Sequence, residues 1–462
     1  MRRMPKLDRN SDEFREAGHR LIDWVADYLD GVDRYDVLSH VKPGEIERAL
    51  PQHPRDDGRP YADLIADFES KIVPGVTHWN HPAFFAYFSI TGSQAGILAE
   101  LLMAALNANG MLWKTSPSLT ELETLTLGWL REALGLPSDL FGIINDTASI
   151  NVFLALAAAR ESLGLDIRGQ GMTGRELPPL KLYVSELTHS SAEKGALALG
   201  FGQKNVVKIP VDDALRMRAD ALEEAIARDR AAGAIPCAIV ATVGTTSFAS
   251  VDPIRAIGEL AAREKIWYHV DTAYAGSAMI CPELRDAWDG IELADSIVVN
   301  PHKWLFTQVD CSVLYTRRPD VLRETFSLVP EYLKTTDTAE VNYMDYGLQL
   351  GRRFRALKLW MVMEHYGLER MRAVIRDQIS FAERLAAELQ KRDDVELLAP
   401  QSFSVVVFRK KNEDTMALLE RINASGDVFV SHTKRGDDYG IRVAIGNGAT
   451  EWRHVERILS FL

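Results

Sequence analysis

Apolar residues recur at helical spacing near the start of the chain. Residues 11–29 place Phe14, Leu21 and Val25 on one face, and residues 61–72 form a second amphipathic segment. A polar stretch at 52–60 separates the two. The run Phe-Phe-Ala-Tyr-Phe at 84–88 is more aromatic than an exposed surface usually is. We predict an N-terminal helical segment over residues 1–88.

Helical patterns alternate with short apolar runs between about residues 90 and 320. The runs lack polar alternation, which is typical of strands buried on both faces of a parallel sheet. Alternation of strands and helices predicts an α/β layer structure, which we assign to residues 89–370. The expected helices are 94–107, 119–136, 149–163 and 191–198, and the expected strands are 182–184, 206–209, 238–243, 267–270, 296–299 and 312–315.

The pattern changes after about residue 370. A long helix is expected at 372–391, followed by strands at 405–408 and 441–444 and a closing helix at 450–462. These elements predict a smaller α+β domain over residues 371–462. The polar stretches 166–179 and 334–346 are expected to be loops.

Composition and charge limit the partners. The net charge of −12 disfavours nucleic-acid binding, which depends on neutralising phosphates. Cys237, Cys281 and Cys311 lie far apart and form no C-x-x-C pair, so we expect neither a disulfide framework nor a metal site. The N-terminus has no apolar signal region and no apolar run is long enough for a membrane span. We expect a cytoplasmic protein without a membrane partner.

Lys303 follows a predicted buried strand at 296–299. Pro301 forces the chain out of the sheet, so that His302 and Lys303 reach the crevice where ligands of open α/β sheets bind. A lysine among apolar neighbours and near another cation favours its neutral form, which can form a Schiff base with an aldehyde cofactor. The alternative is a surface lysine.

Asp271 ends the predicted strand before it. A carboxylate there is costly to bury without a partner, and a protonated ring nitrogen of a cofactor would suit it. A helix cap or an ordinary salt bridge is the alternative.

Three further segments lie at similar junctions. Thr147, Ala148 and Ser149 open a predicted helix, whose free N–H groups suit a phosphate or are merely capped. His189 lies between a strand and a helix, where its ring could stack on a cofactor or serve as a cap. Thr246 could contact a cofactor or form a turn.

These segments resemble a known family. DTAS (146–149), THSSAEKG (188–195), HVDTAYAG (269–276) and NPHKW (300–304) occur in the order found in the group II pyridoxal-phosphate (PLP)-dependent amino-acid decarboxylases. The segments 74–88, 116–123, 331–334 and 350–360 are most similar to the aromatic L-amino-acid decarboxylase branch. The resemblance implies fold type I, the aspartate-aminotransferase-like α/β architecture, with a mainly parallel central sheet.

The resemblance also implies roles. Lys303 would carry PLP, Asp271 would pair with its ring nitrogen, and His189 and Ala273 would pack on its two faces. The loop residue Tyr332 would help to protonate the product carbon, and the stretch 334–346 would exclude water. The family forms homodimers with the active site at the subunit interface. The remaining implied cofactor contacts are Thr147, Ala148, Ser149, Thr246, Asn300 and His302.

The residues expected around the substrate partly match the family and partly depart from it. Trp79, Tyr87 and Phe88 match aromatic pocket positions, although core packing is the alternative. Ile90 replaces a threonine of the dopa-type enzymes. We therefore expect phenylalanine, tryptophan or tyrosine ahead of dopa. Asn109 and Met111 replace larger or more apolar residues that the family contributes from across the interface, and Gly351 resembles the indole-tolerant version of its position. His302 is the remaining implied substrate contact.

Three alternatives stay open. The first is an aromatic aldehyde synthase, which decarboxylates its substrate and also deaminates it oxidatively. In the family this activity accompanies loss of the stacking histidine or the loop tyrosine, and both residues are present here. A decarboxylase for a non-aromatic amino acid is the second. A catalytically inactive protein of the same fold is the third, and the intact set of Lys303, Asp271, His189 and Tyr332 disfavours it.

Overall fold

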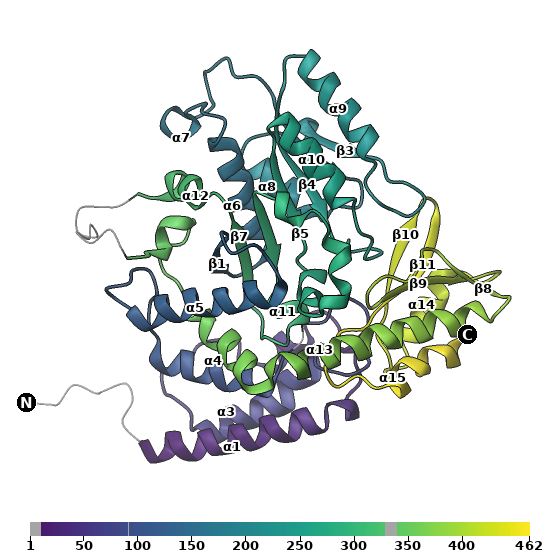
Figure 1. The fold of residues 1–462 in the computed structure, drawn as a ribbon. Coiled ribbons are helices and arrows are strands. Elements are labelled where there is room, and N and C mark those ends of the chain that lie inside the picture. The colour runs from purple at the N-terminus through teal and green to yellow at the C-terminus, as the bar shows by residue number, and fades with distance from the viewer. Residues whose placement is uncertain (1–10, 91, 329–339) are drawn as a thin grey trace, which may run out of the picture.

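The computed structural model describes residues 11–90, 92–328 and 340–462. Its large lobe is built on a seven-stranded sheet of order β1-β7-β6-β5-β4-β2-β3 (Figure 1). The strands are β1 Phe141–Asn145, β2 Leu180–Ser185, β3 Val206–Ile209, β4 Ile235–Thr242, β5 Trp267–Asp271, β6 Ser296–Val299 and β7 Ser312–Thr316.

The mainly parallel sheet expected from the sequence is confirmed. Strands β3, β2, β4, β5 and β6 pair in parallel, whereas β7 runs antiparallel to both β6 and β1. Strands β6 and β7 follow one another in the chain, joined by residues 300–311, and pair directly as antiparallel neighbours. Strand β1 was not predicted.

Helices cover both faces of this sheet (Figure 1). Helices α6, α8 and α12 pack on one face, and α5, α9, α10 and α13 pack on the other. Both faces are therefore buried, which accounts for strands without polar alternation. The bounds are α4 Gln94–Leu106, α5 Pro117–Leu134, α6 Ala148–Glu161, α7 Ile167–Gln170, α8 Ser190–Ala198, α9 Ala219–Ala231, α10 Ile254–Glu264, α11 Pro301–Trp304 and α12 Pro319–Phe326.

The smaller lobe is an antiparallel sheet of order β10-β11-β9-β8, drawn in yellow in Figure 1. Helix α13 (Arg355–Gln390) begins well before the predicted residue 372 and has a break at Gly367 (φ 66°). The boundary predicted between residues 370 and 371 thus lies inside this helix. The other elements are β8 Val395–Leu397, β9 Val405–Lys410, β10 Ser431–Arg435, β11 Asp438–Ala444, α14 Thr415–Asn423 and α15 Trp452–Glu456.

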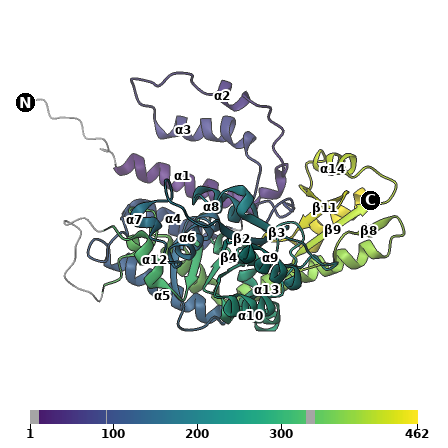
Figure 2. The same ribbon diagram turned by 90° about the horizontal axis from the view of Figure 1, so that it is seen from above.

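The N-terminal helices lie at one side of the large lobe, as Figure 2 shows for α1 (Ser11–Asp30), α2 (Glu45–Ala49) and α3 (Tyr61–Asp67). None of the helices in the described ranges is both long and apolar enough to cross a membrane.

The aromatic run 84–88 joins the two lobes. The Phe85 N–H donates to the Phe429 carbonyl (2.8 Å), and the Ala444 N–H donates to the Phe85 carbonyl (2.9 Å). Phe88 instead stacks on Tyr274 of the large lobe, with ring centroids 3.7 Å apart. This run therefore places aromatic side chains where the lobes meet.

Candidate active site

A pocket of about 510 Å³ opens between the lobes beside Lys303. The 79–90 segment contributes aromatic and apolar walls, the large lobe contributes Thr246, His302 and Lys303, and the small lobe contributes β10, β11 and the end of α14. Its lining residues include Trp79, Tyr87, Phe88, Ile90, Thr246, His302, Lys303 and Arg442.

Lys303 lies on α11, directly after the fully buried strand β6. Its Nζ is 5.3 Å from the centroid of the Phe88 ring. Burial lowers the pKa of the Lys303 amine, the Asp271 carboxylate opposes this, and the Arg442 charge lowers it further. The net effect favours the neutral amine, which is the form that attacks an aldehyde.

Arg442 on β11 is the nearby cation. Its Nε donates to the Thr246 carbonyl (2.8 Å) and its Nη1 to the Ala86 carbonyl (3.1 Å). Its buried Nη2 has no hydrogen-bond partner in the described part of the chain. Burial lowers the pKa of this guanidinium to about 10. The side chain is therefore a buried donor that suits an anionic ligand.

Sequence reasoning overlooked Arg442, although it named the strand that carries it. The one available signal is an arginine between Ile441 and Val443, two apolar residues of a predicted buried strand.

Asp271 ends β5 and is buried between β4 and β6, paired with Thr242 and Val298. Its Oδ1 accepts the Ala273 N–H (3.0 Å), and its Oδ2 accepts no hydrogen bond from the described residues. The carboxylate raises the pKa of both Lys303 and His189, so its charge reaches both groups. It therefore combines a turn contact with a free oxygen.

His189 caps α8. Its Nδ1 accepts the Ser191 N–H (3.2 Å) and lies 2.9 Å from the Ser191 hydroxyl. Burial lowers its pKa, the Lys303 charge lowers it further, and Asp271 opposes the shift. The capping alternative thus holds, and it fixes the orientation of a ring that favours the neutral form.

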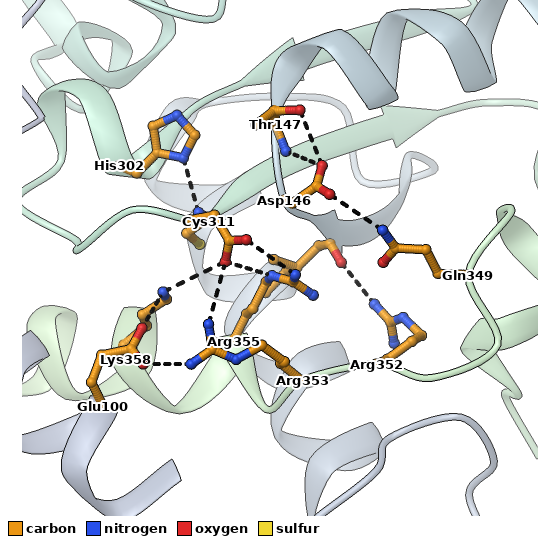
Figure 3. A network of polar contacts seen from close by, with 12 residues as sticks. Glu100, Asp146, Thr147, His302, Cys311, Gln349, Arg352, Arg353, Arg355 and Lys358 are labelled. Atoms are coloured by element: carbon orange, nitrogen blue, oxygen red, sulfur yellow. Dashed lines mark hydrogen bonds and ion pairs between the residues drawn. The ribbon is translucent and has the colours of Figure 1, made fainter. Parts of the chain in front are cut away.

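The N-terminus of α6 begins at Ala148 after Thr147. The Thr147 hydroxyl donates to Asp146 Oδ1 (3.0 Å) and does not cap the helix. The first N–H groups of a helix have no intrahelical partner and attract anions. Gln349 binds the other Asp146 oxygen (3.2 Å), as Figure 3 shows.

Asn300 and His302 are buried after the end of β6, with Asn300 directly before α11 and His302 on α11 next to Lys303. Asn300 Oδ1 accepts the Ser312 hydroxyl (2.5 Å), and His302 Nδ1 accepts the Cys311 N–H (2.9 Å). Burial lowers the pKa of His302 to about 3. The imidazole is therefore neutral at pH 7, with its proton on Nε2 and available to a ligand.

An ion cluster supports the Cys311 segment from beneath (Figure 3). Arg355 Nε binds Asp310 (2.9 Å), while Lys358 and Arg353 bind Glu100 (2.5 and 2.7 Å). Lys358 is fully buried. The cluster ties α4 and α13 to the segment whose backbone orients His302.

The substrate residues fall into two groups. Trp79, Tyr87, Phe88 and Ile90 line the Lys303 pocket, as does Thr246, and the rings of Trp79 and Tyr87 stack at 5.8 Å. Asn109, Met111 and Gly351 are not among its lining residues.

The second group lies together elsewhere in the same chain. Asn109 Oδ1 accepts the N–H of Arg352, the residue after Gly351 (2.9 Å), and Asn109 Nδ2 is 3.3 Å from Met111 Sδ. Within one chain this group therefore does not form part of the walls of the Lys303 pocket.

Tyr332 lies outside the described residues, as does the first part of the stretch 334–346. At the described end of that stretch, Tyr343, Met344 and Asp345 form a buried turn of helix that packs near α12. The expected loop is therefore wrong for residues 343–345.

Lys303 and the buried groups described with it fit PLP. A lysine that favours its neutral form, a buried carboxylate with one free oxygen, a fixed imidazole and a helix N-terminus match the aldehyde, ring nitrogen, ring face and phosphate of this cofactor.

Comparison with known proteins gives the same result. The chain is 39% identical to a phenylacetaldehyde synthase of Arabidopsis thaliana, over 97% of this chain and 94% of the relative. It is also 39% identical to tryptophan decarboxylase 2 of Oryza sativa subsp. japonica, over 97% and 93% of the two chains.

A solved structure of Oryza sativa TDC with PLP and tryptamine superposes with a TM-score of 0.93 at 36% identity, over 99% of both chains. The profile of the pyridoxal-dependent decarboxylase conserved domain matches residues 43–411. This chain belongs to the pyridoxal-dependent decarboxylase family, and its cofactor is PLP.

Proposed function

We propose that the protein decarboxylates an aromatic L-amino acid to the arylalkylamine and CO2, with phenylalanine, tryptophan or tyrosine ahead of dopa. The observation that carries the proposal is the aromatic wall of Trp79, Tyr87 and Phe88 beside Lys303. Such a wall suits a flat apolar ring. Ile90 lines the same pocket and offers no hydroxyl to a catechol.

When bound, PLP supplies an aldehyde for the substrate amine and a ring that accepts the electron pair released with CO2. Lys303 would hold the aldehyde, and Asp271 would keep the ring nitrogen protonated. His189 and Ala273 would hold the two ring faces. Thr147, Ala148, Ser149, Asn300, His302 and Thr246 would bind the phosphate and the ring substituents.

Arg442 would bind the substrate carboxylate. Its Nη2 is buried and lacks a partner among the described residues, and no carboxylate pairs with its guanidinium there. A buried cation of this kind attracts an anion strongly because little water screens it. Tyr332 would donate the proton to the carbon that loses CO2.

A panel of L-amino acids tests the substrate. The purified protein with PLP is expected to release an arylalkylamine from phenylalanine, tryptophan or tyrosine faster than from dopa. Faster turnover of glutamate or aspartate than of every aromatic substrate would contradict the proposal.

The aldehyde synthase alternative has direct support in the Arabidopsis relative. His189 and Tyr332 are both present, which favours plain decarboxylation. The two activities differ in oxygen use. We expect one amine per CO2 without oxygen uptake, whereas aldehyde and peroxide in equal amounts would establish the alternative.

We propose that the active unit is a homodimer. Helix α4 exposes Leu98, Leu101, Leu102 and Leu106, each by 47% or more, next to the Asn109 and Met111 group. Four exposed leucines on one helix form an apolar patch, and such patches usually mark an interface. A second copy on this face would cover the leucines and bring Asn109, Met111 and Gly351 towards the other pocket.

Light scattering tests the dimer. The expected mass is twice the 51.6 kDa of one chain. Leu101→Asp should give a folded monomer with little activity, whereas Lys204→Asp on an exposed turn of the large lobe should leave the mass unchanged. A fully active wild-type monomer would contradict the proposal.

We also propose that the protein works in the cytoplasm. Cys237, Cys281 and Cys311 are all buried and free, which suits a reducing compartment. Cell fractionation should find it with cytoplasmic markers.

A further inference from the structure

A buried histidine beside Asp271 has no part in the functions assigned so far. His269 lies on β5, two residues before Asp271, and is fully buried. Side chains alternate along a strand, so these two point to the same face of the sheet. On the neighbouring strands His269 pairs with Val240 and Ser296.

The hydrogen bonds of Ser296 fix the position of the His269 proton. Ser296 Oγ accepts the Trp267 indole N–H (2.9 Å) and lies 2.8 Å from His269 Nδ1. The hydroxyl has one proton, and Nδ1 is its only acceptor among the described residues. Both contacts are satisfied when the hydroxyl donates to Nδ1. The neutral imidazole then carries its proton on Nε2.

The resulting Nε2–H is buried and has no partner among the described residues. Asp271 Oδ2, on the same face of the same strand, likewise accepts no hydrogen bond within that part of the chain. Burial lowers the pKa of His269 to about 4, and the one charge that opposes this is Asp271. A neutral donor therefore lies within electrostatic reach of a carboxylate that has a free oxygen.

We propose that His269 is a positioning residue for Asp271, whose charged form its Nε2–H stabilises. The contact forms through one buried water or a small rotation of the carboxylate. Trp267, Ser296, His269 and Asp271 then form a chain in which every donor points towards the carboxylate. The inference rests on the proposed role of Asp271, because a stabilised carboxylate holds the PLP ring nitrogen in its protonated form.

The ring nitrogen itself provides the test. The apoprotein is loaded with PLP labelled with ¹⁵N in the ring, and the NMR signal reports whether that nitrogen is protonated. His269→Leu removes the donor but keeps an apolar side chain in the space. We expect the signal to move towards the unprotonated form and PLP affinity to fall roughly ten-fold, as for one lost hydrogen bond to a charged group.

Two matched variants separate positioning from packing. His269→Gln keeps an N–H donor and should restore the signal and the affinity. Val298→Ala truncates a buried neighbour of Asp271 on β6 and should lower stability without moving the signal. A wild-type signal in His269→Leu, or a failure of His269→Gln to restore it, would overturn the inference.

Two further variants cover the remaining outcomes. If His269→Leu does not fold, Ser296→Ala takes its place. This variant removes the hydroxyl that holds the His269 proton on Nε2, so the ¹⁵N signal should move part of the way towards the unprotonated form. An unchanged signal would overturn the inference. Asp271→Asn should move the signal fully, and if it does not, the proposed role of Asp271 fails independently of His269.

Discussion

Lys303 owes its chemistry to the groups that surround it. Burial and Arg442 both favour the neutral amine, and Asp271 limits the effect. The sequence singles out Lys303, Asp271 and His189 as candidates because each lies at the end of a strand or shortly after one. Arg442 and His269 each lie inside a strand. The sequence alone does not show whether the side chain of a polar strand residue faces a ligand site or solvent.

Removal of the Arg442 charge should make Lys303 more basic. In Arg442→Gln the pKa of the Lys303 amine rises, so the amine becomes protonated at a higher pH. The rate at which the apoprotein takes up PLP falls as the pH is lowered, and this fall should therefore begin at a higher pH than in wild type. The KM for the amino acid should rise at least ten-fold, since a charged hydrogen bond is lost. Stopped-flow absorbance across pH measures the first effect and steady-state kinetics the second.

The control is Arg453→Gln, which removes an exposed arginine of the same lobe. It should change neither quantity. If the rate of PLP uptake falls at the same pH in Arg442→Gln as in wild type, the guanidinium does not act on Lys303.

Among the elements, six of the seven strands of the large sheet were predicted, because both faces of that sheet are covered and the strands appear as apolar runs; β1 was not. The direction of β7 and the early start of α13 were not, because periodicity says nothing of how strands pair or where one helix continues into another. The grouping of Asn109, Met111 and Gly351 outside the lining of the Lys303 pocket also depends on tertiary packing. The ion pairs that hold these elements together could not be predicted from the sequence either.

One buried ion pair joins α5 to the segment before α13. Arg352 Nη2 lies 2.6 Å from Glu123 Oε1 and 2.8 Å from the Ile144 carbonyl of β1, with both side chains about 5% exposed. Arg352→Met leaves Glu123 buried without its partner and should lower the free energy of unfolding by about 3–5 kcal/mol. Urea unfolding of the apoprotein measures this.

Arg353 provides a matched control in the next position. It pairs with Glu100 at the surface and is 54% exposed. Arg353→Met should cost about 1 kcal/mol or less. Equal losses in the two variants would show that the buried pair adds nothing beyond a surface pair.

For the whole molecule, buried histidines set the response to acid. Burial lowers the pKa of His81 and His269 to about 4 and that of His302 to about 3. Between pH ~6.5 and ~4 the unfolded chain binds protons that the folded chain does not. The free energy of unfolding should therefore fall as the pH falls, by about 1.4 kcal/mol per pH unit for each histidine.

Calorimetry between pH 7.5 and 4.5 tests this, with a falling Tm as the expected result. His81→Asn should reduce the slope, whereas His19→Asn on the exposed face of α1 should not. A Tm that is constant over this range would contradict the assignment of neutral buried histidines.

The location of the cofactor on the chain shows whether Lys303 carries it. The protein with PLP is reduced with borohydride, digested and analysed by mass spectrometry. We predict the pyridoxyl mass on the peptide that contains Lys303, and its loss in Lys303→Ala. The same mass on another lysine, or no labelled peptide from a protein that turns over substrate, would contradict the account.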